Sequence, residues 1–237
     1  MDRLRIIGDV HGQVTRDDLP RLDRRPYVEI VGGAPHSVQV GDMGDAETYE
    51  TLGALVDPSR HRFFPGNHDH HGSFPARCLG DFGEVVLGGV RFFFIRGAAS
   101  TDREKLVALG NRLGRTLWYE AEELTDDEMK SAEAVYADAR PEIVLSHDGP
   151  TDAARAAFAE STRRRIDRPG APFARSRTTD FLGRLLEVHR PRLWIFGHHH
   201  VEWTGWDGMT RFRCVSELGW VDITPEAEII PGAGVVG

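Results

Sequence analysis

The chain has 237 residues, 40% of them hydrophobic and 28% charged, and a net charge of −8. This composition is typical of a globular protein, and the negative charge argues against a general nucleic-acid binder, which normally needs a basic surface. Two cysteines are too few for a disulfide scaffold or a cysteine-rich zinc site. No apolar run reaches the roughly 18 residues that span a bilayer, and a strand-like segment follows Met1 without a leader. We therefore expect a cytoplasmic protein with no membrane partner.

Five short apolar segments recur along the chain, and polar turn residues follow each of them. Runs of this kind are typical of buried strands. The five segments are 5–7, 37–40, 62–64, 143–145 and 193–196. In chain order, we also expect a helix at 46–55, a hairpin of strands at 85–87 and 90–95, helices at 125–137 and 178–189, and late strands at 211–215 and 227–230.

Local signals support several of these elements. Thr125 and Glu128 have the spacing of a capping box at a helix start, and Gly88-Gly89 suits a tight hairpin turn. Trp203 and Trp206 are expected in a late strand, as core or sheet-face residues. The mixture of helices and buried strands predicts an α/β or α+β sandwich with helices outside.

The ends of the five expected strands carry the residues with functional potential. They read Gly-Asp-Val-His-Gly at 8–12, Gly-Asp-Met-Gly-Asp at 41–45, Gly-Asn-His-Asp at 66–69, His147, and Gly-His-His-His at 197–200. Each of these motifs alone is a common turn composition, so the evidence lies in their joint occurrence. Ligand sites of layered sheets gather at the carboxyl ends of strands, and we expect the five loops to converge.

Carboxylate and imidazole side chains are the ligands that zinc, manganese, iron and nickel accept. A pair of metal ions roughly 3.5–4 Å apart needs a carboxylate that bridges them. Asp42 is the natural candidate for this bridge.

Taken together, the five motifs resemble the signature motifs of the calcineurin-like metallophosphoesterase superfamily, over residues 9–200. The resemblance implies an α/β fold, a four-layer α/β/β/α sandwich with a dinuclear metal site at the carboxyl ends of the strands. We expect a single domain over residues 1–237, with insertions near 98–124 and 155–177.

Carried over residue by residue, the resemblance implies two metal positions that share Asp42. One would be held by Asp9, His11, Asp42 and His200, and the other by Asp42, Asn67, His147 and His198. The expected cofactors are two divalent transition-metal ions, manganese first, with iron, nickel and zinc as alternatives.

The resemblance also implies catalytic roles. His68 would act as general acid or stabilise developing charge, and Asp69 is placed with it in the catalytic set, while Asp69 or Asp45 would orient neighbouring groups. The expected reaction is hydrolysis by in-line attack of a metal-bridging hydroxide on a phosphate ester. The substrate would be a mono- or diester of a nucleotide or of another small molecule. Ala46 and Asp69 depart from the motifs of the serine/threonine protein phosphatases, so protein phosphatase activity is not expected.

Alternatives remain open at this point. The chain could be a catalytically silent metal-binding scaffold, or a nuclease or nucleic-acid end phosphatase that uses an arginine-rich stretch. Arg163, Arg164 and Arg165 lie in that stretch, which could equally be a solvated loop. His199 is either an exposed loop residue or part of the substrate cleft, and Trp118 is expected to be a packing anchor. Nucleic acid is not the favoured partner, and the sequence indicates no oligomeric state.

Overall fold

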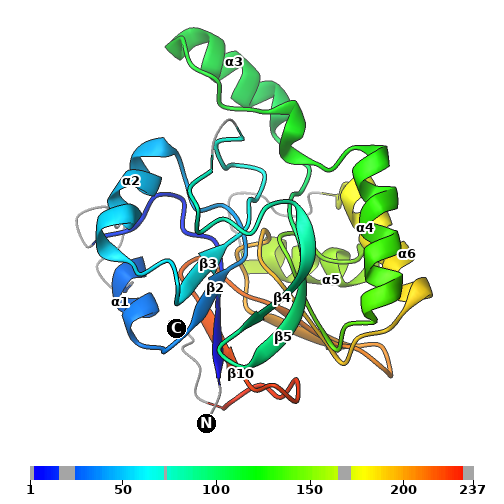
Figure 1. Cartoon of the computed structure of the whole chain (residues 1–237). Coiled ribbons are helices and arrows are strands. Elements are labelled where there is room, and N and C mark those ends of the chain that lie inside the picture. Colours follow the sequence, from blue (N-terminus) through cyan, green and yellow to red (C-terminus); the bar gives the residue numbers. More distant parts are fainter. Residues whose placement is uncertain (1–2, 16–24, 72–73, 165–171, 232–237) are drawn as a thin grey trace.

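Two β-sheets pack face to face, and helices cover both outer surfaces (Figure 1). The computed structural model describes residues 3–15, 25–71, 74–164 and 172–231. The first sheet has the order β10-β1-β2-β3 and contains β1 (Leu4–Ile7), β2 (Ser37–Gln39), β3 (His61–Phe63) and β10 (Trp220–Ile223). The second has the order β4-β5-β6-β7-β9-β8 and contains β4 (Phe82–Leu87), β5 (Val90–Ile95), β6 (Ile143–Ser146), β7 (Leu193–Phe196), β8 (Trp203–Trp206) and β9 (Arg211–Cys214).

The helices form the two outer layers. On one side, α1 (Tyr27–Gly32) and α2 (Ala46–Leu55) cover the four-stranded sheet (Figure 1). On the other side, α4 (Asp126–Ala139), α5 (Thr151–Arg164) and α6 (Arg177–Val188) cover the six-stranded sheet. The predicted four-layer α/β/β/α sandwich is therefore confirmed.

The central strands β1, β2, β6 and β7 are buried on both faces, because a second sheet covers one face and helices cover the other. Side chains alternate along a strand, so Ile6 of β1 packs between the sheets while Ile7 packs under α1 and α2. In β5, Phe92 lies between the sheets and Phe93 packs under the helices of the other side. This alternation divides the apolar side chains into three cores, one for each interface between layers.

The strands that lead to the predicted ligand loops run in parallel within each sheet. β1, β2 and β3 are parallel neighbours in the first sheet, and β6 and β7 are parallel neighbours in the second. All five were predicted from the sequence to within about one residue, the ordinary uncertainty of element ends. The hairpin of β4 and β5, the helices α2, α4 and α6, and the capping box at Thr125 are also confirmed.

One predicted strand at the end of the chain was wrong, and another strand was not predicted. Residues 227–230 form no strand, and Ile229 makes only an isolated bridge to Ile223 of β10. β10, whose residues pair antiparallel with β1, was not predicted from the sequence. Trp206 lies in a late strand, as predicted, and not in the core, because β8 is an edge strand and 73% of the Trp206 surface is exposed.

The segment near 98–124 contains α3 (Arg103–Leu113), which projects from the body at the top of Figure 1. The chain then returns past Trp118 to the short 3-10 helix η2 (Glu120–Glu122). Trp118 is half-buried under the Arg103 guanidinium, whose carbon lies 3.9 Å from the ring centre. That face of the indole is covered and cannot stack on a base.

Among the described residues, no helix is both long enough and apolar enough to cross a membrane.

A buried ion pair joins the two ends of the chain in the first sheet. The Arg5 side chain donates to Asp222 through Nε at 2.7 Å and Nη2 at 2.9 Å, and the pair is almost fully buried. Asp222→Ala would leave the guanidinium buried without its counter-ion, so we expect the free energy of unfolding to fall by about 3–5 kcal/mol. Chemical denaturation measures this loss.

An exposed ion pair supplies the control for this prediction. Arg192 and Glu228 are more than half exposed, so Arg192→Ala should change the free energy of unfolding little. If Asp222→Ala costs no more than Arg192→Ala, the pair of Arg5 and Asp222 does not hold the sheet together.

Candidate metal centre

The structure brings all seven predicted metal ligands to one place. Asp9, His11, Asp42 and His200 offer ligand atoms that lie within 4.8 Å of one another, and so do Asp42, His147 and His198. Asn67 joins the second group, because its Oδ1 lies 3.0 Å from His147 Nε2. Asp42 belongs to both groups, which is the position that a bridging ligand needs.

The loops that carry these side chains come from both sheets. β1, β2 and β3 of the first sheet lead to Asp9, Asp42 and Asn67, whereas β6 and β7 of the second lead to His147 and His198. The site therefore spans the edge where the two sheets meet.

The backbone is strained at several of these ligands. His11, Asp42, His198 and His200 all have positive φ, between 50° and 63°. Residues with side chains rarely adopt this left-handed conformation, and they persist in it only where the surrounding structure holds them there. The strain turns these side chains into the space between the loops.

Close approach explains the glycines beside the ligands. A Cβ atom on Gly66 would lie 2.2 Å from Asp42 Oδ1 and 2.6 Å from His147 Nε2. Gly41 has φ of +101°, and its Cβ would lie 2.3 Å from His147 Nδ1. Any larger residue at these positions would push the two groups of ligands apart.

Asp9 and Asp42 are fully buried carboxylates. Burial raises the pKa of each, but the neighbouring histidines outweigh it: His200 brings the pKa of Asp9 to about 2, and His147 holds that of Asp42 well below its ordinary value. Conversely, burial lowers the pKa of His147, and Asp42 more than compensates by raising it to about 10. Positive charge beside Asp9 and Asp42 therefore stabilises these two buried carboxylates.

The contacts of His147 and Asp42 leave several lone pairs directed at one space, which a cation would fill. His147 Nδ1 lies 2.8 Å from the Val40 carbonyl oxygen, which can only accept, so Nδ1 carries the proton. The other nitrogen, Nε2, faces Asn67 Oδ1 at 3.0 Å and Asp42 Oδ1 at 3.4 Å. In the described part of the chain, Asp42 Oδ2 is buried with no hydrogen-bond partner. A divalent cation would satisfy these converging lone pairs.

The other group of ligands has the same character. His11 Nε2 and His200 Nε2 lie 3.0 Å apart, and His200 Nε2 lies 2.9 Å from Asp9 Oδ2. Two imidazole nitrogens directed at each other beside a buried carboxylate are typical of a site that binds transition metals.

His68 occupies the open side of the centre. Its side chain is exposed, and its ring centre lies 5.7 Å from that of His11. Its backbone N–H donates to Asp42 Oδ1 at 2.8 Å, which fixes the loop against the ligands. The imidazole is thus close to the metal positions and accessible to a substrate.

Asp69 was placed with His68 as catalytic, but it lies behind the ligands. It is fully buried and accepts hydrogen bonds from the backbone N–H groups of Asp42, Gly44 and Gly66 at 2.7–2.9 Å, and from the Tyr49 hydroxyl at 3.1 Å. A carboxylate so enclosed cannot touch a substrate. Asp69 instead holds the Asp42 and Asn67 loops together, which fits the orienting role considered for it.

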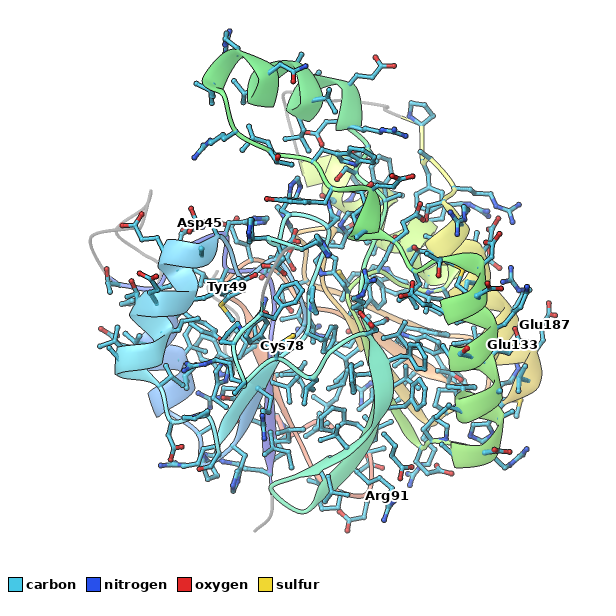
Figure 2. The ribbon with its side chains drawn as sticks, turned by 45° about the horizontal axis from the view of Figure 1, so that its top comes forward. Asp45, Tyr49, Cys78, Arg91, Glu133 and Glu187 are labelled. Atoms are coloured by element: carbon cyan, nitrogen blue, oxygen red, sulfur yellow. The ribbon has the colours of Figure 1, made fainter. Side chains whose placement is uncertain are left out.

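Asp45 has a different task from the one expected of it. It caps α2 by accepting from the Thr48 backbone N–H at 3.1 Å, and Tyr49 lies one turn along the same helix (Figure 2). Its side chain is exposed. Asp45 therefore stabilises a helix start beside the centre.

His199 is not the exposed loop residue of the first alternative. It is buried rather than exposed, and its Nε2 lies 3.1 Å from Asp148 Oδ1. Its ring centre lies 5.0 Å from that of His198. Asp148 was not predicted as a site residue, although its place directly after His147 was the available signal.

The arginine-rich stretch is in part a helix. Residues 151–164 form α5, where an insertion with a loop was expected from residue 155. Arg163 donates to Glu160 one turn earlier, at 2.8 and 2.9 Å. The Arg164 side chain and Arg165 lie outside the described residues. Nothing in the Arg163 contacts favours a nuclease.

The pairing of Arg163 leads to a prediction for multi-phosphate substrates. Arg163→Ala should change KM for a nucleoside triphosphate or an oligonucleotide by no more than about twofold, because exposed ion pairs and charges contribute little. Steady-state kinetics at low and moderate salt test this expectation. A large rise in KM that salt suppresses would instead assign Arg163 to the binding of phosphate.

Comparison with known protein families identifies the family of the chain. The family model for the calcineurin-like phosphoesterases matches residues 3–202. A search among curated proteins gives no match to the sequence. Among solved structures, a Thermotoga maritima protein determined by NMR shares 14% identity, with a TM-score of 0.42 and coverage of 97% of this chain and 98% of the other.

Two further structures are similar at low identity. A Staphylococcus aureus protein assigned as a 5'-nucleotidase, solved with α-ketoglutarate, has 10% identity and a TM-score of 0.52, with 96% of this chain and 52% of the other covered. A phosphopantetheinyl hydrolase from Mycobacterium tuberculosis has 10% identity and a TM-score of 0.41, with 92% and 91% covered. The likeness to the Staphylococcus aureus protein shows a shared fold.

The family model spans every loop that contributes to the centre, from Asp9 to His200, and most of the chain. The protein therefore belongs to the calcineurin-like phosphoesterase family and is a metal-dependent hydrolase of phosphate esters.

Proposed function

We propose that the protein hydrolyses a phosphomonoester or phosphodiester of a nucleotide or another small molecule at a dinuclear metal centre. The observation that carries this proposal is the place of Asp42 in both groups of converging ligands. Asp9, His11, Asp42 and His200 would hold one ion, and Asp42, Asn67, His147 and His198 the other. A silent scaffold is disfavoured by the exposed His68 next to a complete set of ligands.

His68 and Asp69 would take different roles in the proposed reaction. When bound, two divalent ions would neutralise charge on the phosphoryl group and lower the pKa of a coordinated water toward neutrality. His68 is accessible beside the ligands, and a ring nitrogen would donate a proton or a hydrogen bond to the leaving oxygen. Asp69 would keep the Asp42 and Asn67 loops in position through its backbone hydrogen bonds.

Manganese is the proposed ion, with iron, nickel and zinc as alternatives, because mixed oxygen and imidazole ligands suit all four.

The two cysteines, Cys78 and Cys214, are free thiols. Free thiols agree with the cytoplasmic location that we propose.

Metal removal and reconstitution test the proposal. Protein treated with a chelator should lose hydrolysis of chromogenic mono- and diesters, and addition of manganese, iron, nickel or zinc should restore it. The largest recovery is expected with manganese. Hydrolysis that survives complete removal of metal, or that no metal restores, would contradict the proposal.

A further inference from the structure

A partly buried chain of hydrogen bonds connects the 98–124 segment to one predicted metal ligand. Asn67 Nδ2 donates to Ser100 Oγ at 2.9 Å, and Ser100 Oγ donates to Glu122 Oε2 at 2.5 Å. The other Glu122 oxygen, Oε1, accepts from the Ser100 backbone N–H at 3.0 Å. Ser100 precedes α3 and Glu122 ends η2. The two ends of the projecting segment are thus linked to Asn67, Ser100 directly and Glu122 through Ser100.

Glu122 is an unusual residue in this position. It is only 5% exposed, and within the described part of the chain it forms no ion pair. Burying a carboxylate without a cation is costly. Among the residues that the structure describes, only Ser100 donates to its two oxygens, and these hydrogen bonds offset that cost.

The directions of these hydrogen bonds are determined by chemistry. A carboxylate only accepts, so the single hydroxyl proton of Ser100 is committed to Glu122. Ser100 Oγ can then only accept from Asn67, which must present its NH₂ group there. The Asn67 carbonyl oxygen is consequently turned to the opposite side, where it lies 3.0 Å from His147 Nε2.

This direction matters because only the oxygen of an asparagine side chain can bind a metal ion. The NH₂ group has no available lone pair, and an asparagine turned by 180° would direct it at the ligands instead. The two orientations are nearly equal in shape, so packing alone does not select between them.

We propose that Ser100 and Glu122 are positioning residues that turn the Asn67 carbonyl oxygen toward the metal position shared with His147 and His198. The inference rests on the proposed dinuclear centre. It adds a function for the 98–124 segment, which contains none of the five ligand motifs. Neighbouring contacts hold the arrangement: the Gly97 N–H donates to the Pro65 carbonyl at 3.0 Å, and Arg96 Nη1 donates to the Ala121 carbonyl at 2.5 Å.

Glu122→Gln tests the direction of the chain without a change in shape. The Ser100 backbone N–H requires an oxygen at Oε1, so the new NH₂ group would replace Oε2 and donate to Ser100 Oγ. The Ser100 proton would then point at Asn67 and favour its reversed orientation. Titration of metal-free protein with manganese by calorimetry should show two sites in the wild type. In Glu122→Gln, one site should weaken by about 10–100-fold, the range for residues that orient metal ligands, while the other stays unchanged.

Two further variants complete the experiment. Glu120→Gln changes an exposed acid of the same short helix and should bind manganese as the wild type does. Ser100→Ala should weaken the same single site, and Ser100→Thr, which keeps the hydroxyl, should restore it. Thermal unfolding of the metal-free variants separates this role from a structural one, since Glu122→Gln should melt close to the wild type.

The outcomes distinguish the inference from the proposed function. If the wild type binds two manganese ions and Glu122→Gln binds both with unchanged affinity, Ser100 and Glu122 do not orient Asn67. Equal weakening of both sites, or a large fall in the melting temperature of the metal-free protein, would assign Glu122 to folding and overturn the inference. A wild type that binds no metal would instead refute the dinuclear centre itself.

Discussion

Asp42→Asn is expected to remove both metal ions and to lower kcat/KM by more than about 10³-fold, because the ions supply several kcal/mol of transition-state stabilisation. Asparagine keeps the shape of the side chain and tolerates the positive φ of this position. It removes the negative charge that would bridge the two ions. Elemental analysis of the purified variant measures the metal content, and steady-state kinetics measure the loss of activity.

Asp45→Asn is the matched control. Asp45 lies three residues away and caps α2, and asparagine caps a helix as well as aspartate does. This variant should keep its metal content and activity. If Asp42→Asn retains as much metal as the wild type, Asp42 is not the bridge and the two groups of ligands do not form one centre.

His68→Ala is expected to lower kcat by roughly 10²–10⁴-fold, the range for loss of a general acid, with metal content close to that of the wild type. His68 is exposed beside the ligands, and only its backbone N–H contacts Asp42. Removal of the imidazole should therefore leave the metal ligands in place. Elemental analysis and kinetics on the same preparation check both parts.

The leaving group supplies a sharper test of the role of His68. A nitrophenolate leaves without a proton, whereas an alkoxide needs one, so His68→Ala should affect alkyl esters far more than nitrophenyl esters. An equal loss for both classes would show that His68 stabilises charge rather than donates a proton. Loss of metal from the variant would make His68 a ligand and overturn the role given to it.

The convergence of the ligand loops could be predicted from the sequence because its parts are local. Each ligand loop follows a short strand that is largely buried, as at Ile6 and Ile7 before Asp9. The strand ends were therefore visible, and parallel pairing brought them together. The resemblance to the family then supplied the division of the ligands between two ions.

The residues behind the ligands could not be predicted in the same way. Asp69 stands in a ligand motif, but its burial and its bonds to three backbone N–H groups depend on how the Asp42 and Asn67 loops pack. Ser100 and Glu122 lie far from Asn67 in the sequence and match no motif. Their role depends on contacts that form only in the folded chain.

Errors in the elements also have physical causes. The arginines of 155–164 suggested a solvated loop, but the alanines of the same segment have high helix propensity, and α5 forms there. At the end of the chain, residues 227–230 have the apolar character of a strand. The place beside β1 is taken by β10, which buries Trp220 and Val221 against the two cores.

Anomalous diffraction from crystals grown with manganese would locate the metal ions themselves. We expect two anomalous peaks roughly 3.5–4 Å apart, one among Asp9, His11 and His200 and the other among Asn67, His147 and His198, with Asp42 in contact with both. The Asn67 oxygen should face the second peak. A single peak, or two peaks that do not share Asp42, would contradict the dinuclear centre.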